Sequence, residues 1–240
     1  MMKFSDPRFD WRLTGNHWRI TVKRNSFLLY TTVVALVPGF ASAQTWLQTD
    51  PTATSYYGGA MINFENTSAN TLQLTGRFDL NLAGNGGTTN SYQVYVKNSA
   101  LSGNETNAAL WTLLGEATTT VSAQGSWTTI DVGNTFDVAA GSTIGLAVFL
   151  SSTDNGAGYV GYRSGTGTFS DSNVTITTGI VKGYRDGYKP GFDNLFNVET
   201  FNPRTWSGRV EYQAVPEPAS LTLLGVGLAG LIARKRRNRS

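Results

Sequence analysis

Residues 72 to 82 read Leu-Gln-Leu-Thr-Gly-Arg-Phe-Asp-Leu-Asn-Leu, with an apolar residue or glycine at every second position. Successive side chains of a β-strand point to opposite faces of its sheet, so this alternation predicts a strand with one buried face and one face in water. A second run, Thr143 to Leu150, is apolar on both faces, which is typical of a strand at the centre of a core. Both runs indicate a β fold.

The region between Gln44 and Ala214 follows the same pattern. It is rich in Thr, Ser, Asn, Gly and aromatic residues and has no long run at helical spacing. Gly- and Asn-rich turns separate further strands, which are expected at 60–64, 92–97, 111–117, 127–132, 159–163, 174–181 and 206–213. We therefore predict one all-β domain over residues 44–214, an antiparallel β-sandwich of jelly-roll or Greek-key type, with a barrel as the alternative.

Residues 1–43 contain the pattern of a secretory signal peptide. Lys23-Arg24 is a basic region, Phe27 to Phe40 is an apolar region expected to form a helix, and Ala41-Ser42-Ala43 is a small-residue cleavage site before Gln44. The mixed-charge leader that precedes them is unusual for a signal peptide. We therefore expect translation to begin at Val22, and the alternative is an unusually long n-region.

The C-terminal segment, residues 215–240, has three parts. The first is the motif Val215-Pro216-Glu217-Pro218-Ala219-Ser220, whose prolines favour an extended chain that joins neither a helix nor a central strand. Residues 219–233 carry no charge and would make a transmembrane helix of about 22 Å, short for a hydrocarbon core of about 30 Å. The tail 234–240 then places stop-transfer charges on the cytoplasmic side, at Arg234, Lys235, Arg236, Arg237 and Arg239.

This C-terminal segment resembles the PEP-CTERM sorting signal in its Pro-Glu-Pro motif, short apolar segment and terminal basic cluster, in that order. The resemblance implies export by a bacterium with a two-membrane envelope and processing by an exosortase, a membrane-embedded cysteine transpeptidase-like enzyme. It further implies an inner-membrane-anchored precursor and a product in the cell envelope or extracellular matrix. Such proteins are associated with extracellular polysaccharide and biofilm matrix.

The middle of the domain resembles an extracellular β-sandwich module found in other proteins with such sorting tails. The similar segments are Tyr92 to Lys97, Trp111 to Glu116, Ala140 to Thr143 and Arg204 to Tyr212. The resemblance implies a fold and no activity.

Composition excludes several kinds of chemistry for the exported domain. Of 19 Lys and Arg, six precede Gln44 and five follow Ser220, and of 16 Asp and Glu, two precede Gln44 and one is Glu217. The domain therefore carries eight basic and thirteen acidic residues, a net charge of −5, which argues against nucleic acid as a partner. It contains no cysteine, and the single histidine, His17, lies in the leader. Catalytic triads, histidine-ligated zinc and thiolate chemistry are excluded.

Carboxylates are the remaining candidates for chemistry, namely Asp131, Asp137, Asp154 and Asp171. A glycosidase needs two of them about 5 to 10 Å apart across a cleft, whereas Asp most often starts a turn, and we favour that role. Asp171-Ser172-Asn173 would suit calcium, but the spacing of an EF-hand is absent, so we expect no metal and no cofactor.

The segment from Gly183 to Phe196 is the most unusual of the domain, with aromatic residues at every fourth position. Gly187, Pro190 and Gly191 interrupt any helix, so we expect a loop. Rings beside planar polar groups suit a sugar-binding surface. The candidate glycan contacts are Tyr184, Arg185, Tyr188 and Phe192. The alternative is that the rings fold back over one end of the sandwich, and Tyr56-Tyr57 allows the same two interpretations.

Three functions remain open. We expect a non-enzymatic structural or matrix protein whose processing enzymes are signal peptidase and an exosortase, and whose partner is extracellular polysaccharide. The first alternative is a carbohydrate-binding module that uses the loop at 183–206. The second is a carboxylate-dependent glycan hydrolase, which the absence of histidine disfavours.

Overall fold

The computed structural model describes residues 9–14, 17–22, 43–84, 86–153, 158–183 and 195–215 of the 240-residue chain. The chain divides into two units, Met1–Gly39 and Phe40–Ser240. In the first unit, β1 (Phe9–Thr14) pairs antiparallel with β2 (His17–Val22), a hairpin that the sequence did not predict. The expected signal helix and the expected transmembrane helix lie outside the described residues.

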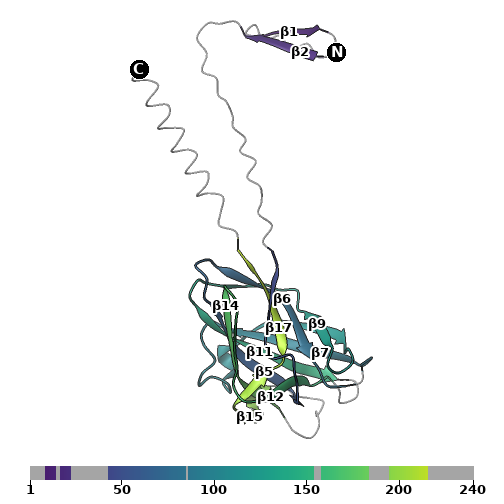
Figure 1. Ribbon diagram of the computed structural model, residues 1–240, viewed down its shortest axis with the longest axis vertical. Helices are drawn as coiled ribbons and strands as arrows, with labels where there is room; N and C mark the ends of the chain where they lie inside the picture. Colours follow the sequence, from purple (N-terminus) through teal and green to yellow (C-terminus); the bar gives the residue numbers. More distant parts are fainter. Residues whose placement is uncertain are drawn as a thin grey trace. The chain divides into compact units, whose positions relative to one another are not determined.

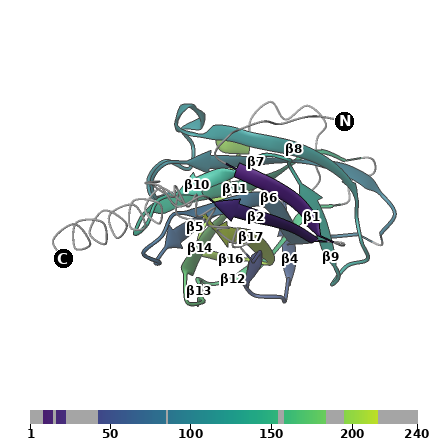
Figure 2. The ribbon, with the colours of Figure 1, turned by 90° about the horizontal axis from the view of Figure 1, so that it is seen from above.

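The second unit is built from two antiparallel sheets that face each other (Figures 1 and 2). The smaller sheet has the order β10-β6-β17-β3, and β9 also pairs with β6. Its strands are β3 (Thr45–Gln48), β6 (Leu72–Asn81), β9 (Trp127–Asp131), β10 (Phe136–Val138) and β17 (Gly208–Ala214).

The larger sheet has the order β13-β14-β5-β11-β7-β8, and β15 also pairs with β14. Its strands are β5 (Gly59–Asn66), β7 (Thr89–Lys97), β8 (Thr112–Thr120), β11 (Thr143–Thr153), β13 (Thr168–Ser170), β14 (Val174–Lys182) and β15 (Thr200–Phe201). A third, three-stranded sheet has the order β16-β12-β4, with β4 (Ser55–Tyr57), β12 (Val160–Ser164) and β16 (Arg204–Trp206). We call these the five-, seven- and three-stranded sheets.

The main core lies between the two larger sheets. The alternation of β6 is realised there, because Leu72, Leu74, Phe78 and Leu80 are buried in this cluster while the residues between them point outward. Gly76 completes the inward row with a φ of +80. A Cβ atom on this residue would lie only 2.2 Å from the Asn134 carbonyl oxygen, so no side chain would fit here.

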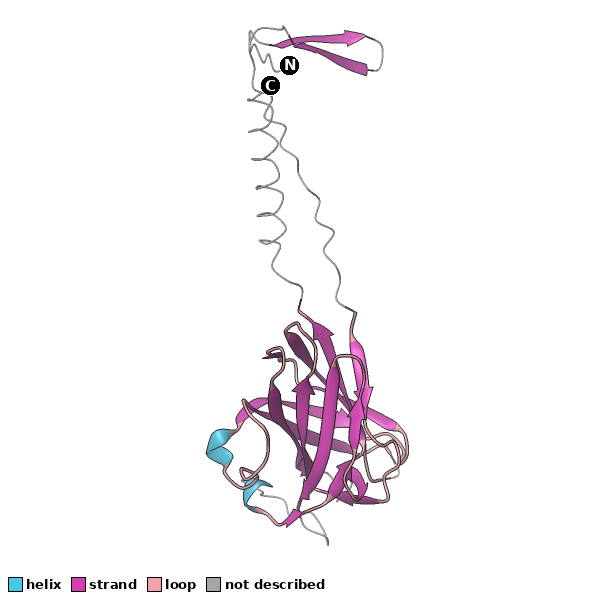
Figure 3. Cartoon of the chain, turned by 60° about the vertical axis from the view of Figure 1, so that its left-hand side comes forward, coloured by secondary structure: helices cyan, strands magenta, loops and turns pink. Residues whose placement is uncertain are grey.

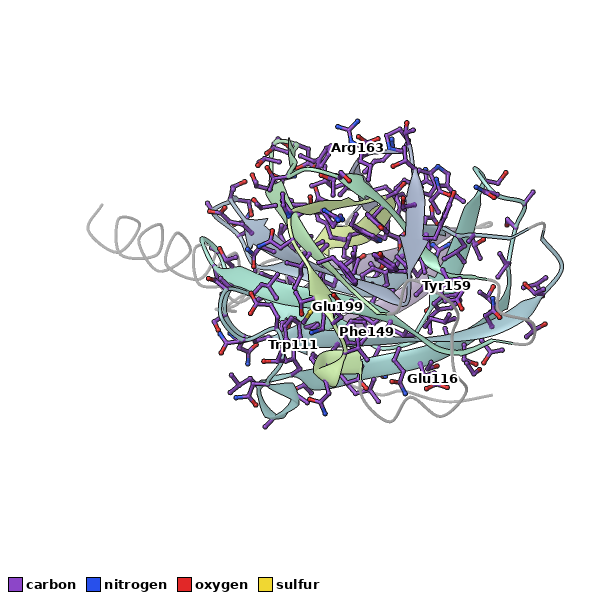
Figure 4. All side chains as sticks on the ribbon, turned by 90° about the horizontal axis from the view of Figure 1, so that it is seen from below. Trp111, Glu116, Phe149, Tyr159, Arg163 and Glu199 are labelled. Atoms are coloured by element: carbon purple, nitrogen blue, oxygen red, sulfur yellow. The ribbon has the colours of Figure 1, made fainter. Side chains whose placement is uncertain are left out.

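A second hydrophobic cluster covers the outer face of the seven-stranded sheet. Its buried members are Met61, Leu101, Trp111, Ala147, Phe149, Ile180, Phe196 and Val198. Some of them are outward-facing residues of β5, β11 and β14, and the others come from the segments 101–111 and 196–198, which contain the short 3₁₀ helices η1 (Ala108–Leu110) and η2 (Leu195–Asn197). Both helices lie on the same side of the domain (Figure 3). In Figure 4, Trp111 and Phe149 lie close together and Arg163 lies at the opposite side.

Most strand predictions are confirmed. The all-β fold and the sandwich are as expected, and Thr143–Leu150 is indeed central, because β11 lies between β5 and β7 and is buried on both faces. The strand predicted at 206–213 is confirmed from Gly208 onward as β17, but its start is wrong, because Trp206 belongs to β16. The chain changes sheets at Ser207, whose N–H donates to the Gly161 carbonyl at 3.0 Å, so β16 and β17 belong to different sheets.

Among the described residues, every member of both clusters lies between Leu47 and Tyr212, so we expect the segment 43–215 to fold without the flanking signals. Among the helices of the described segments, none has the length and apolar character needed to cross a bilayer.

Candidate functional site

The two processing signals join the sandwich on neighbouring strands. β3 pairs antiparallel with β17, and Thr45 is the partner of Tyr212. The predicted cleavage site Ala43-Gln44 directly precedes β3, and both residues are exposed. Val215, the first residue of the sorting motif, directly follows β17, and its N–H donates to the Thr71 carbonyl at 2.9 Å. The sandwich therefore begins and ends at the same end of the same sheet.

Most residues of the two signals lie outside the described part of the chain. These are Ala41 of the cleavage site, Pro216, Glu217, Pro218, Ala219 and Ser220 of the sorting motif, and the basic tail from Arg234 to Arg239. Their predicted roles stay predictions from the sequence.

The aromatic loop is described only at its ends. The candidate glycan contacts Tyr184, Arg185, Tyr188 and Phe192 lie outside the described residues. Phe196, the last ring of the series, is buried in the second cluster, 5.1 Å from Phe149 and 5.5 Å from Trp111 between ring centroids. This ring covers a face of the seven-stranded sheet and not an end of the sandwich.

Lys182 directly precedes that loop and hydrogen-bonds the segment that follows it. Its side chain is buried, and its Nζ donates to the Phe196 carbonyl at 3.0 Å and to the Thr200 hydroxyl at 2.7 Å. Burial lowers the pKa of Lys182, and the charge of Glu105 opposes that shift. Sequence reasoning missed this lysine, because nothing in its neighbourhood marks it as buried.

The Tyr56-Tyr57 pair is part of the structure's packing. Tyr57 is buried and stacks on Tyr162 at 5.0 Å and on Phe201 at 4.6 Å between centroids. Tyr56 accepts a hydrogen bond through its hydroxyl from the Gln124 amide at 3.0 Å. The core interpretation therefore holds for Tyr57.

The candidate carboxylates are occupied by local contacts. Asp171 accepts from the N–H groups of Asn173 and Val174 and from the Tyr212 hydroxyl, the last at 2.6 Å. Asp131 accepts from the N–H of Gly133 at 2.9 Å, as a turn former does.

Asp137 accepts from the Gln73 amide at 2.8 Å, and Asp154 lies outside the described residues. Within the described segments, His, Cys, Asp and Glu side chains nowhere gather in a group of three that would hold a metal ion.

The outer face of the five-stranded sheet carries an ionic network. Glu211 of β17 is 1 % exposed and accepts from Thr75 at 2.6 Å and from Arg77 at 3.0 Å. Asp79 of β6 has a side chain 3 % exposed, pairs with Arg209, and accepts from Thr129 at 2.6 Å. Each buried carboxylate thus has an arginine and a threonine hydroxyl as partners, which offsets the cost of burying its charge.

Two tryptophans lie against this network. The Cζ of Arg209 is 5.3 Å from the ring centroid of Trp46 and 4.9 Å from that of Trp127, and the Cζ of Arg77 is 5.6 Å from the Trp46 ring. These distances are those of cation–π contacts. Both rings are half-buried. We call this surface the tryptophan–arginine face, formed by Trp46, Arg77, Asp79, Trp127, Arg209 and Glu211.

Sequence reasoning predicted that this side of β6 is wet but not that a network lies there. The partners are far apart in the chain, since 130 positions separate Asp79 from Arg209 and 134 separate Arg77 from Glu211. The alternation of β6 was the only feature of the sequence that indicated a polar face here.

Comparison with known families decides the nature of the C-terminal segment. Residues 214–237 match the family described as the PEP-CTERM protein-sorting motif. The chain carries a PEP-CTERM sorting signal. This PEP-CTERM protein is therefore exported, targeted to an exosortase and transiently anchored in the membrane. The matched segment begins at Ala214, the last residue of β17, so the signal follows the sandwich without a linker.

Other comparisons add no function. No curated protein matches the PEP-CTERM chain. It is similar to a chain in the structure of the infectious bursal disease virus Gt strain, with 12% identity, a TM-score of 0.25, and coverage of 86% of this chain and 49% of the viral one. The corresponding values for the Gx strain are 12%, 0.20, 82% and 46%. The chain spans about half the length of these viral chains.

Proposed function

We propose that this protein is a non-enzymatic component of the cell envelope or extracellular matrix that associates with extracellular polysaccharide. The N-terminal signal directs export, the sorting signal directs the domain to the exosortase, and the domain then acts as a displayed β-sandwich. Support comes from its chemistry, because the exported domain has neither His nor Cys and Asp131, Asp137 and Asp171 are engaged in turns and side-chain pairs.

The pairing of β3 with β17 supports the anchored and displayed part of this proposal. Because the chain enters the sandwich at Gln44 and leaves it at Val215 on adjacent strands, a single end of the domain meets both membrane signals. Ala219 follows Val215 by four positions, which is about 14 Å of extended chain. The anchored precursor would thus hold that end beside the membrane and present the rest of the sandwich outward until the exosortase releases it.

Replacing Pro216 and Pro218 by alanine tests the processing step. Inner-membrane, envelope and matrix fractions of cells producing each form would be compared by immunoblotting. We expect the variant to accumulate as an uncut inner-membrane precursor and to disappear from the matrix fraction. Pro51→Ala, at an exposed proline of the sandwich, is the matched control and should be processed normally.

Two further measurements test the rest of the proposal. Deletion of the gene should weaken the cohesion of flocs or biofilm, and the intact gene should restore it. Purified segment 43–215 should release no new reducing ends from extracellular polysaccharide of the producing cells. Release of reducing ends would show an enzyme, and normal cohesion together with absence of the protein from the matrix would overturn the matrix role.

A further inference from the structure

We propose that the tryptophan–arginine face binds an extended, uncharged polysaccharide. This inference rests on the proposed function, since it names the surface and the ligand class through which the exported domain would associate with the matrix. It places the glycan site on the five-stranded sheet and not in the loop at 183–206.

The first argument is the placement of the rings. Trp46 lies on β3 and Trp127 on β9, the two strands that flank β17 and β6, so they are three strand spacings apart across the sheet, about 14 Å. They are also displaced along the strands, because Trp46 lies opposite Glu211 and Trp127 opposite Asn81, on the two sides of the Arg209–Asp79 pair. Arg209 lies between them, and its Cζ is within 5.3 Å of both ring centroids. Both side chains therefore reach toward Arg209, and the two rings lie diagonally across the sheet. A row of aromatic surface suits the apolar faces of successive sugars in an extended chain.

The second argument is that the polar groups around the rings are held in place. Thr75 and Arg77 are fixed by hydrogen bonds to Glu211, and Thr129 by its bond to Asp79. A guanidinium has five N–H donors. Arg77 contacts Glu211 at 3.0 Å through Nη1 and Asp131 at 3.8 Å through Nε, and its side chain remains 39% exposed, so donors are left for a ligand. Groups that are ordered before binding lose little conformational entropy when a sugar hydroxyl arrives.

The third argument is charge. The face carries Arg77 and Arg209 against Asp79 and Glu211, which cancel as pairs. Asp131 and Asp137, on β9 and β10 of the same sheet, leave a net charge of −2 there, and the whole exported domain carries −5. This negative charge would repel an anionic polymer. A cationic polymer would find no concentrated negative site, because Asp79 and Glu211 are already paired with arginines. The rings and hydroxyl partners therefore favour an uncharged chain.

Affinity electrophoresis of segment 43–215 tests the proposal directly. The gels would contain hydroxyethylcellulose, laminarin or galactomannan as uncharged polymers, alginate as a polyanion and chitosan as a polycation. We expect at least one uncharged polymer to retard the protein. Trp46→Ala and Trp127→Ala should each weaken that retardation about tenfold, the effect of about 1.4 kcal/mol. Leu113→Ala, at an apolar side chain 47% exposed on β8 of the other sheet, should leave it unchanged.

Several results would overturn the proposal. Absence of retardation by all three uncharged polymers would do so, as would retardation by alginate or chitosan alone, or equal retardation of the tryptophan variants and the parent. A variant that misfolds is recognised by its thermal melting curve. In that case the unaltered segment is measured instead. A bound uncharged polymer should shield its half-buried tryptophans and reduce the quenching of their fluorescence by acrylamide. Unchanged quenching would refute the site.

An experiment in cells separates this inference from the function beneath it. The Trp46→Ala, Trp127→Ala double variant should be exported and processed but lost from the matrix to the medium. If the double variant stays in the matrix, the site is wrong and the matrix role stands. If the unaltered protein is itself absent from the matrix, the proposed function fails.

Discussion

The two larger sheets of the sandwich share one core, but their outer faces differ. The outer face of the seven-stranded sheet is apolar and covered around β11, with Phe149 packed against Phe196 and Tyr95. The outer face of the five-stranded sheet carries charged pairs and two half-buried tryptophans. The difference shows that the fold uses loop segments to close one face and leaves the other to meet water, which is why we place binding on the latter.

The chain encodes this difference in the outward positions of its central strands. β11 presents Ala147 and Phe149 on its outer side, whereas β6 presents Thr75, Arg77 and Asp79. Apolar outward positions need a cover, and the segments around Trp111 and Phe196 supply it. Charged outward positions need only neighbours of opposite charge.

The largest effect is expected on the covered face. Phe149→Ala should lower the free energy of unfolding by about 3 to 5 kcal/mol, because the ring is 2% exposed and its loss leaves a cavity under the cover. Urea denaturation of segment 43–215 measures this. Leu113→Ala, on the same sheet but exposed, should change the free energy by about 0.5 kcal/mol or less. Similar costs for both variants would contradict a buried outer face.

The next effect concerns the ionic network. Arg209→Ala should cost about 3 kcal/mol, because Asp79 then remains buried without its cation. The matched control is Arg163→Ala, which breaks a 2.7 Å pair with Asp50. This arginine is 50% exposed against 29% for Arg209, and Asp50 keeps the Thr52 N–H as a donor, so the variant should cost less, about 1 kcal/mol. Denaturation curves at high salt would sharpen the contrast, since salt screens the pair with the more exposed arginine more strongly. Equal losses would show that Asp79 is not held by its arginine.

The local sequence pattern predicted most of the strands. It did not predict how strands far apart in the chain pair. The alternation of 72–82 and the apolar run 143–150 gave β6 and β11, because side-chain periodicity depends only on neighbours in the chain. Short strands such as β3 and β15, of four and two residues, have too few positions to show a period. The strand at 206–213 was predicted as one because the change of sheet at Ser207 depends on a contact with Gly161.

The candidate site divides in the same way. The sorting signal is a linear motif, and the family match at 214–237 confirms that it was recognised from the sequence. The tryptophan–arginine face joins β3, β6, β9 and β17, whose register the sequence does not reveal. The face therefore emerges only once the strands are paired.

A smaller effect is expected for the half-buried tryptophans. Trp127→Ala should lower the free energy of unfolding by about 1 kcal/mol, because the ring is half-buried and its contact with Arg209 is close to solvent. Trp127→Phe keeps a ring over the guanidinium and should recover part of the loss. Thermal and urea unfolding of both variants measure this. A loss as large as that of Phe149→Ala would show that Trp127 belongs to the core and cannot contact a ligand.

The last prediction concerns Lys182, which hydrogen-bonds the segment around Phe196 that covers the outer face of the seven-stranded sheet. Its effect is on the slope of the free energy of unfolding against pH. Burial lowers the pKa of Lys182 in the folded protein below its ordinary value of 10.5, so the unfolded chain binds more protons between the two pKa values. Stability contributed by this lysine should therefore rise with pH in that window, by no more than about 1.4 kcal/mol per pH unit for one proton. Lys182→Met removes the titration and with it the rise.

The quantity to compare is the difference in the free energy of unfolding between the parent and Lys182→Met at each pH. Burial raises the pKa values of Tyr92 and Tyr212, so both proteins lose stability as the pH passes above 10.0, the ordinary value for tyrosine. These losses cancel when the free energy of unfolding of Lys182→Met is subtracted from that of the parent. The lost hydrogen bonds to Phe196 and Thr200 shift the whole difference without changing its slope. A difference that stays constant up to pH 10.5 would mean that Lys182 reaches water when the cover opens, and that the covered face is less closed than its burial indicates.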